Sequence, residues 1–252
     1  MYHKDELLIV IPSRFGSTRL PGKPLLLIED KPMIQHVYER LSKKYKCIVA
    51  TESEKIIETV INFNGNAIMT SENCRNGTVR CSEAIFKLKE KNNFIPKYIV
   101  NVQGDEPLIN MAHLDKLISS FINTNFDIGT LCTKASQNNL KSKSNSYVVF
   151  DSKNKAIFFS RYQIPFDREN KNINKYKHIG VYIFKSEVLI DLFNLKESKL
   201  ENSESLEQLG WLENGYKIQV TTVDNDGSIS VDTMSDLEYV RELFKNNYKL
   251  KL

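Results

Sequence analysis

Short apolar runs alternate with segments of helical periodicity along the first half of this sequence. The run from Glu6 to Pro12 (ELLIVIP) is typical of a strand that is buried on both faces of a parallel sheet. Pro32 is placed to open a helix, because apolar residues with i, i+3, i+4, i+7 spacing follow it at Ile34, Val37, Tyr38 and Leu41. Further strands are predicted over residues 46–51, 67–70 and 97–102, and further helices over residues 53–61 (with Ser53 as N-cap), 78–91 and 111–123. Strands that alternate with helices favour an α/β fold with a parallel sheet and helices on both of its faces.

The second half of the sequence has a different pattern. Residues 138–146 (NNLKSKSNS) are polar and linker-like, and a second polar loop is expected over residues 169–175. A β-hairpin is predicted over residues 147–150 and 156–159, strands over 178–184 and 217–223, and helices over 203–214 and 233–246. We therefore expect a single domain over residues 1–252, with a smaller, partly antiparallel lobe around residues 135–215.

Composition excludes several classes of protein. The chain has 252 residues with 13 Phe and 11 Tyr, which are too many core-forming side chains for a disordered coil. Its longest apolar run, Leu7–Pro12, is far shorter than the roughly 20 residues of a membrane span, and the acidic start is unlike a signal peptide. Four scattered cysteines without Cys-x-x-Cys spacing indicate neither a zinc site nor a disulfide scaffold. The scattered cysteines favour a reducing cytoplasm, and the short apolar runs indicate no membrane insertion. The net charge is only +4 and Lys and Glu are interleaved, which is typical of a solvated surface, so we expect no nucleic-acid partner.

A loop rich in glycine and basic residues follows the first predicted strand. Residues 13–23 (SRFGSTRLPGK) hold Arg14, Arg19 and Lys23 together with Gly16 and Gly22. Backbone N–H groups exposed at the glycines and three cations suit a polyanion such as a triphosphate. The spacing matches neither the Walker A loop nor the dinucleotide-binding Gly-x-Gly-x-x-Gly pattern, and a basic surface turn is the alternative.

Carboxylates stand where two other segments leave the predicted sheet. Asp105 and Glu106 follow a predicted strand, and Asp232 precedes the last predicted helix. Ligands of open α/β sheets bind at the carboxyl ends of the strands, and Mg²⁺ takes one or two carboxylates together with substrate phosphates. Asp105 and Asp232 are therefore candidate magnesium ligands. The alternatives are an acidic turn at Asp105, and an N-cap role for Thr233 or Asp236 beside Asp232.

Further polar residues gather in the expected lobe. They are Ser160, Arg161, His178, Glu207 and Gln208. Arg161 offers a planar guanidinium group that binds carboxylates through two parallel hydrogen bonds. His178 opens an otherwise apolar strand, where a hydrogen-bonded core histidine is more common than a catalytic one. Binding of a substrate carboxylate and a purely structural role both remain open for this group.

Nine segments in the same order carry a family resemblance. They are IPSRFGSTRLPGKPL, KPMIQHVYER, IVAT, NGTVR, VNVQGDEPLI, FFSRYQIPFDR, KHIGVY, SLEQL and VDTMSDL, and they extend over almost the whole chain. Together they resemble the 3-deoxy-manno-octulosonate (Kdo) cytidylyltransferases, the CMP-Kdo synthetases. The chain departs from the family pattern at Gly210, where the family generally has Arg, and at Met234 and Ser235, which replace Pro and Glu. Val79 stands where an acidic residue is usual.

The resemblance implies a fold and a reaction. The fold is an α/β, Rossmann-like nucleotidyltransferase sheet of the glycosyltransferase-A type, with helices on both faces and a smaller lobe through which a homodimer forms. The reaction is the Mg²⁺-dependent transfer of CMP from CTP to Kdo, giving CMP-Kdo and pyrophosphate for lipopolysaccharide or capsule synthesis. Direct displacement without a covalent enzyme intermediate is expected. The alternatives are the same reaction on 8-amino-Kdo or another 2-keto-3-deoxy sugar acid, and a non-catalytic nucleotide-binding relative.

The resemblance also assigns roles to residues of this chain. It places Arg14, Arg19 and Lys23 on the triphosphate, with Arg80 near the nucleotide. Asp105 and Asp232 are the implied magnesium ligands, and with Arg14 and Lys23 they form the implied catalytic set. The residues implied to hold the sugar acid are Gln103, Arg161, His178, Glu207 and Gln208.

Overall fold

The computed structural model describes residues 6–16, 19–92, 95–136, 145–169, 171–225, 227 and 229–246. The chain divides into two compact units. Unit 1 comprises Met1–Ala112, Lys185–Phe193 and Gly227–Leu252, and unit 2 comprises His113–Phe184 and Asn194–Asp226. The expected lobe around residues 135–215 stays a prediction.

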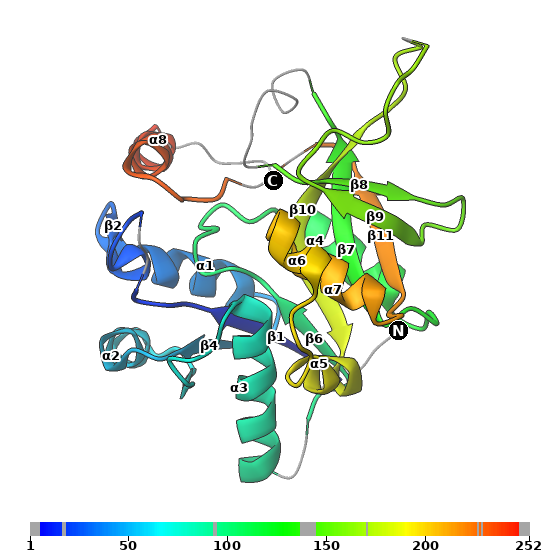
Figure 1. Cartoon of the computed structure of the whole chain (residues 1–252). Coiled ribbons are helices and arrows are strands. Elements are labelled where there is room, and N and C mark those ends of the chain that lie inside the picture. The colour runs from blue at the N-terminus through cyan, green and yellow to red at the C-terminus, as the bar shows by residue number, and fades with distance from the viewer. Residues whose placement is uncertain are drawn as a thin grey trace. The chain divides into compact units, whose positions relative to one another are not determined.

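Unit 1 contains parallel strands in the order β6, β1, β4, β5, of which Figure 1 labels the first three. β1 (Leu7–Pro12) pairs with β4 (Cys47–Thr51) on one side and with β6 (Tyr98–Asn101) on the other, and β5 (Ala67–Met69) pairs with β4. Ile9, Val10 and Ile11 are fully buried, because helices cover both faces of the sheet. The strands predicted in the first half of the chain are thereby confirmed.

Helices lie on both faces of this sheet, as the sequence predicts. α1 (Met33–Ser42) and α3 (Gly77–Asn92) lie on opposite sides of β1 (Figure 1). α1 buries the face that its periodicity indicates, including Val37 and Leu41. α2 (Glu54–Asn62) begins directly after Ser53, which occupies the predicted N-cap position, although its side chain makes no capping hydrogen bond. The negative charge of Glu54 in the first turn still favours the helix start.

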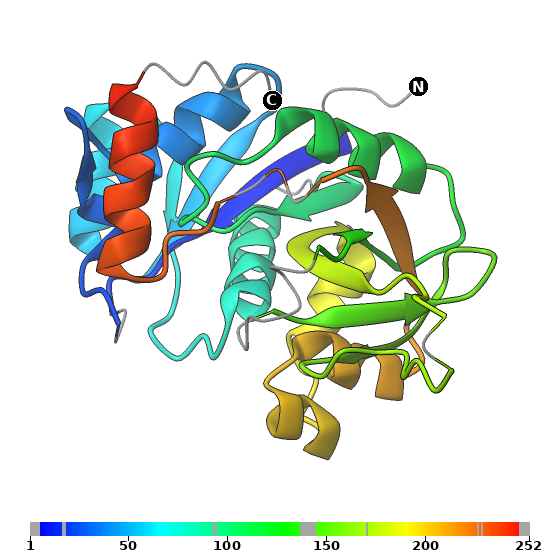
Figure 2. The same cartoon turned by 90° about the horizontal axis from the view of Figure 1, so that it is seen from above.

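The last helix of the chain packs against an early segment. α8 (Met234–Lys245) lies beside β2 (Leu27–Ile28), more than 200 positions away in the sequence (Figure 2). Leu237 and Val240 of α8 share one buried apolar cluster with Ile28. This packing brings the start of α8, and with it Asp232, next to the loop that follows β1. Short elements complete this region: η2 (Lys23–Leu25), a single 3-10 turn, and β3 (Lys31–Pro32), which pairs with β2.

Unit 2 has strands of both orientations. β7 (Ile128–Lys134) pairs antiparallel with β10 (Tyr176–Lys185) and parallel with β11 (Ile218–Val223). β8 (Tyr147–Phe150) and β9 (Ala156–Ser160) form the predicted antiparallel hairpin. The helices of this part of the chain are α4 (Met111–Phe121), α6 (Lys199–Glu204) and α7 (Glu207–Glu213). The partly antiparallel pairing expected for the second half of the chain is confirmed.

Several elements differ from the sequence prediction. β7 and α5 (Ser186–Leu192) were not predicted. The helix predicted over residues 203–214 is confirmed for α7 but not as one continuous helix, because Ser205 adopts φ 51°, a left-handed conformation that ends α6 before α7 begins. Most of the predicted polar linker over residues 138–146 lies outside the described residues. Among the described residues, no helix combines the length and apolar character needed to cross a membrane.

Candidate active site

A cavity of about 340 Å³ in unit 1 collects most of the residues predicted from the sequence. It lies beyond the carboxyl ends of β1 and β6, where ligands of open α/β sheets bind. The predicted site residues that line it are Arg14, Arg19, Lys23, Arg80, Gln103, Asp105 and Asp232. The segment 74–77 forms a further part of its wall; its last two residues open the NGTVR segment of the family resemblance, but none of the four was assigned a role in the site.

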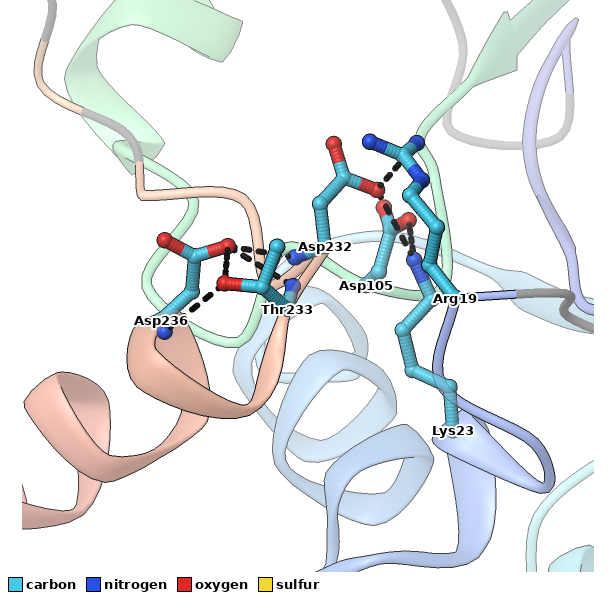
Figure 3. A network of polar contacts seen from close by, with 6 residues as sticks. All are labelled: Arg19, Lys23, Asp105, Asp232, Thr233 and Asp236. Carbon is cyan, nitrogen blue, oxygen red and sulfur yellow. Dashed lines mark hydrogen bonds and ion pairs between the residues drawn. The ribbon is translucent and has the colours of Figure 1, made fainter.

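Two carboxylates converge on one ammonium group at the edge of this cavity (Figure 3). Lys23 Nζ donates a hydrogen bond to Asp105 Oδ2 and a second one, 3.3 Å long, to Asp232 Oδ1. Arg19 Nη2 lies 3.2 Å from the same oxygen of Asp232. The Lys23 side chain is only 12% exposed, so its charge is partly withdrawn from water and interacts strongly with both carboxylates. The sequence analysis placed all these residues in one site, and the structure brings them together.

The backbone around Asp232 is held on two sides. Val231 N–H donates to the Asp105 carbonyl oxygen over 2.9 Å, which joins the two carboxylate-bearing loops. Thr233 and Asp236 form a capping box at the start of α8, confirming their predicted capping role. Burial opposes ionisation of Asp236, but hydrogen bonds from Thr233 and Asp232 outweigh it and hold the pKa of this carboxyl below its usual value. The Asp236 side chain thus accepts hydrogen bonds at the start of α8, whereas the Asp232 side chain lines the cavity (Figure 3).

The basic loop after β1 is closed on itself at Phe15 and Gly22. Gly22 N–H donates to the Phe15 carbonyl oxygen over 3.1 Å, and Gly22 adopts φ 66°, which favours glycine. This turn leads directly into η2, whose first residue is Lys23. The position of the Lys23 ammonium group therefore depends on how Phe15 is held.

A close approach at Gly104 shapes the floor of the cavity. A Cβ atom on Gly104 would lie 2.1 Å from Ser13 Oγ and 3.1 Å from the Pro12 carbonyl oxygen. Gly104 N–H donates to that same carbonyl oxygen over 3.2 Å. Only glycine lets the ends of β1 and β6 come this close, and Asp105 follows directly.

Arg80 enters the cavity wall from the first turn of α3. Its guanidinium group donates to Thr70 Oγ1 over 2.6 Å, and Nη1 lies 2.9 Å from Glu52 Oε2. Arg80 is almost fully buried, so its charge depends on that carboxylate. Glu52 was missed in the sequence analysis. Its position resembles that of Asp105, because Glu52 follows β4 and Asp105 follows β6.

The segment before α3 is held by Glu83. Its two carboxylate oxygens accept hydrogen bonds from Ser71 N–H over 2.9 Å and from Cys74 Sγ over 3.0 Å. Burial, together with the Glu83 carboxylate, raises the pKa of the Cys74 thiol to about 12, so it stays a protonated donor. Asn76 Oδ1 accepts from Val79 N–H over 2.8 Å and caps the first turn of α3, whose N-terminal dipole favours an anion.

His178 is buried in unit 2 and its ring is hydrogen-bonded on both sides. Nε2 lies 2.9 Å from Thr130 Oγ1, and Nδ1 lies 3.3 Å from Gln208 Nε2. The atom of Gln208 in this contact is the amide nitrogen, which can only donate, so Nδ1 accepts and the proton of the neutral ring is on Nε2. Burial, with smaller effects of Arg161 and Lys177, lowers the pKa of His178 to about 3. The ring is therefore neutral at physiological pH, with both nitrogens engaged inside unit 2.

Arg161 is held by the turn between α6 and α7. Its backbone N–H donates to Glu204 Oε2 over 2.7 Å, and its guanidinium group donates to the carbonyl oxygens of Glu204 and Ser205 over 3.1 Å each. Glu207 is the first residue of α7. The predicted sugar-binding residues are thus divided between the units, with Gln103 in unit 1 and Arg161, His178, Glu207 and Gln208 in unit 2.

The parallel sheet, the basic loop after its central strand and the paired carboxylates beyond it define an α/β nucleotidyltransferase. The model of the cytidylyltransferase family matches residues 8–218. Curated 3-deoxy-manno-octulosonate cytidylyltransferases from Thermodesulfovibrio yellowstonii and Fusobacterium nucleatum are 45% and 44% identical, over 95% and 96% of this chain and 98% of each relative. The chain belongs to the 3-deoxy-manno-octulosonate cytidylyltransferase family.

Solved structures agree with this family and with the fold. A CMP:2-keto-3-deoxy-manno-octonic acid synthetase complexed with CTP is 36% identical, with a TM-score of 0.88 over 96% of this chain and 99% of that one. The inositol-1-phosphate CTP transferase from T. maritima, at 16% identity and a TM-score of 0.64, covers 99% of each chain and shares the fold. The α/β fold class and the family suggested by the sequence motifs are both confirmed.

Proposed function

We propose that this protein transfers CMP from CTP to Kdo in a Mg²⁺-dependent reaction that gives CMP-Kdo and pyrophosphate. The observation that carries the proposal is the convergence of Asp105 and Asp232 on one cation, in a cavity that Arg14 and Arg19 also line. The names of the curated relatives support Kdo as the acceptor, and the solved relative in complex with CTP supports CTP as the donor.

Asp105 and Asp232 have the chemistry that a magnesium ion requires. Their oxygens converge on one position that a cationic group, Lys23 Nζ, already contacts. Carboxylate oxygens supplemented by substrate phosphates are the usual donors for Mg²⁺. When bound, the ion supplies positive charge that offsets the charge of the triphosphate and of the departing pyrophosphate.

Arg14, Arg19 and Lys23 bind and orient the triphosphate in this proposal. The anomeric hydroxyl oxygen of Kdo forms a bond to the α-phosphorus, and the bond from that phosphorus to the bridging oxygen of pyrophosphate breaks. The hydroxyl proton is released to water, and pyrophosphate leaves in line with the attacking oxygen. The basic side chains hold two anionic substrates near each other, so positioning and charge compensation carry the catalysis. Arg80, which is paired with Glu52, shapes the wall beside the nucleotide.

Arg161, Glu207, Gln208, His178 and Gln103 hold the sugar acid. The guanidinium group of Arg161 suits the sugar carboxylate, because its planar donors match two oxygens at once. His178 is neutral and hydrogen-bonded to Gln208, so it contributes by orienting that amide toward the sugar hydroxyls.

A homodimer formed through unit 2 is part of the proposal. Large apolar side chains of this unit are exposed on β9 and on the loop after it: Ile157 (61%), Tyr162 (84%) and Phe166 (85%). Such side chains on one segment are typical of a protein–protein interface. We further propose a cytoplasmic enzyme that serves lipopolysaccharide or capsule synthesis.

A pyrophosphate-release assay with CTP and a panel of sugar acids tests the reaction. We expect release that requires CTP, Mg²⁺ and Kdo together, and almost none from the Asp105→Asn variant. Faster release with 8-amino-Kdo or another 2-keto-3-deoxy acid would assign that substrate instead. Binding of CTP in calorimetry without release for any sugar acid would identify a non-catalytic relative.

A further inference from the structure

Glu52 joins two separate parts of the cavity wall without lining the cavity itself. One of its carboxylate oxygens contacts the basic loop after β1, and the other contacts Arg80 on α3. We infer that Glu52 is a positioning residue that sets the distance between the triphosphate-binding loop and α3. The inference rests on the proposed binding of CTP in this cavity.

The contact with the basic loop is made at its backbone. Phe15 N–H donates to Glu52 Oε1 over 2.7 Å, and the Phe15 carbonyl oxygen accepts from Gly22 N–H over 3.1 Å. Phe15 is therefore the residue at which the loop is both closed and attached to the end of β4. Lys23 follows Gly22 directly. The position of its ammonium group therefore depends on Glu52 through two consecutive hydrogen bonds, from Phe15 N–H to Glu52 and from Gly22 N–H to the Phe15 carbonyl oxygen.

The contact with α3 is an ion pair in a buried position. Glu52 Oε2 lies 2.9 Å from Arg80 Nη1, and the side chains of Glu52 and Arg80 are 14% and 5% exposed. At such burial, removal of one partner leaves the other charge without compensation. Loss of the Glu52 charge would therefore displace Arg80 from its place in the cavity wall.

A lost carboxylate at position 52 therefore has two separable consequences. Glu52→Gln retains an oxygen that accepts from Phe15 N–H but removes the charge that pairs with Arg80. Glu52→Ala removes both contacts and frees the loop. Glu39→Gln is the matched control, because Glu39 pairs with Lys31 at a partly exposed position on α1 that does not line the cavity.

Calorimetry with CTP and steady-state kinetics test the inference. We expect Glu52→Ala to raise the Kd for CTP at least about tenfold, since displacement of a binding group by about 1 Å is sufficient for such losses. Glu52→Gln should show a smaller increase, and Glu39→Gln should bind CTP like the wild type. The KM for the sugar acid should stay within about twofold in all three variants, because the affected contacts are with the other substrate.

A double-mutant cycle with Lys23→Ala distinguishes positioning from a general loss of stability. If Glu52 acts by placing the loop, Lys23→Ala should cost much less CTP affinity in the Glu52→Ala background than in the wild type. Additive losses, or wild-type CTP affinity in a folded Glu52→Ala variant, would overturn the inference. Failure of the wild type to bind CTP would instead overturn the proposed function.

Discussion

The ammonium group of Lys23 donates a hydrogen bond to the carboxylate of Asp105, 82 positions away in the sequence, and also reaches Asp232. The same oxygens are the proposed magnesium ligands, so the ammonium group and the metal ion compete for them. Removal of a binding residue usually weakens binding at its site. Removal of Lys23 is instead predicted to strengthen the binding of a metal ion.

Lys23→Met should increase the affinity of the nucleotide-free protein for a divalent cation. Loss of the ammonium charge leaves two carboxylates that repel each other, and a metal ion relieves that repulsion. We expect Mn²⁺, followed by electron paramagnetic resonance, to bind about tenfold more tightly than to the wild type, which corresponds to roughly 1.4 kcal/mol. Lys31→Met, which removes the surface ion pair between Lys31 of β3 and Glu39 of α1, is the control. Unchanged or weaker Mn²⁺ binding in Lys23→Met would contradict competition at this position.

Arg19→Ala and Lys23→Ala should weaken the binding of CTP more than that of CMP. In the proposed arrangement these cations contact the β- and γ-phosphates, which CMP lacks, and each charge-assisted hydrogen bond is worth about 1.5–3 kcal/mol. Calorimetric titration of each variant with both nucleotides measures the difference. Equal losses for CTP and CMP would place these side chains away from the β- and γ-phosphates.

Asp105→Asn should reduce turnover by at least about 10²–10³ at millimolar Mg²⁺, because it removes a negative oxygen ligand of the proposed ion. The fold should persist, since the Asp105 backbone carbonyl still accepts from Val231 N–H. Circular dichroism checks the fold, and pyrophosphate release measures the rate. A rate near that of the wild type would show that Asp105 is not a metal ligand.

Arg161→Lys should raise the KM for the sugar acid and leave the KM for CTP within about threefold. The lysine keeps the positive charge but loses the planar arrangement of donors that matches a carboxylate. Initial rates with each substrate varied in turn separate the two constants. A raised KM for CTP with an unchanged KM for the sugar acid would make Arg161 a phosphate ligand.

The buried His178 should make the protein less stable as the pH falls below about 6.5. Its pKa in the folded protein is about 3, against 6.5 for an ordinary histidine, so in this range only the unfolded chain takes up the proton. Between pH 6.5 and 5 the free energy of unfolding should therefore decrease by up to about 1.4 kcal/mol per pH unit from this group. Denaturant titrations of the wild type and His178→Asn measure the slope. The variant should have the shallower slope, and equal slopes would show that His178 is protonated in the folded protein.

Much of the fold was accessible from local sequence patterns. The apolar run of β1, the periodicity of α1 and the alternation of strands with helices depend on residues close together in the chain, so the sequence predicts them directly. The hairpin of β8 and β9 follows from the same kind of signal. Elements without such a signal were missed: the composition of α5 is not distinctive over its short length, and the left-handed Ser205 that divides α6 from α7 is not encoded by a glycine.

By itself the sequence determined which residues are available for chemistry: the basic loop of Arg14, Arg19 and Lys23, and the carboxylates that follow strand ends. Only the tertiary structure decided how they are paired. The contact between Lys23 and Asp232 spans 209 positions, and the two contacts of Glu52 join the loop after β1 to α3. Such contacts depend on how strands and helices pack, and packing is set by the whole core rather than by any local pattern. The same reason explains His178, whose neutral state follows from burial among residues that its own sequence neighbourhood does not reveal.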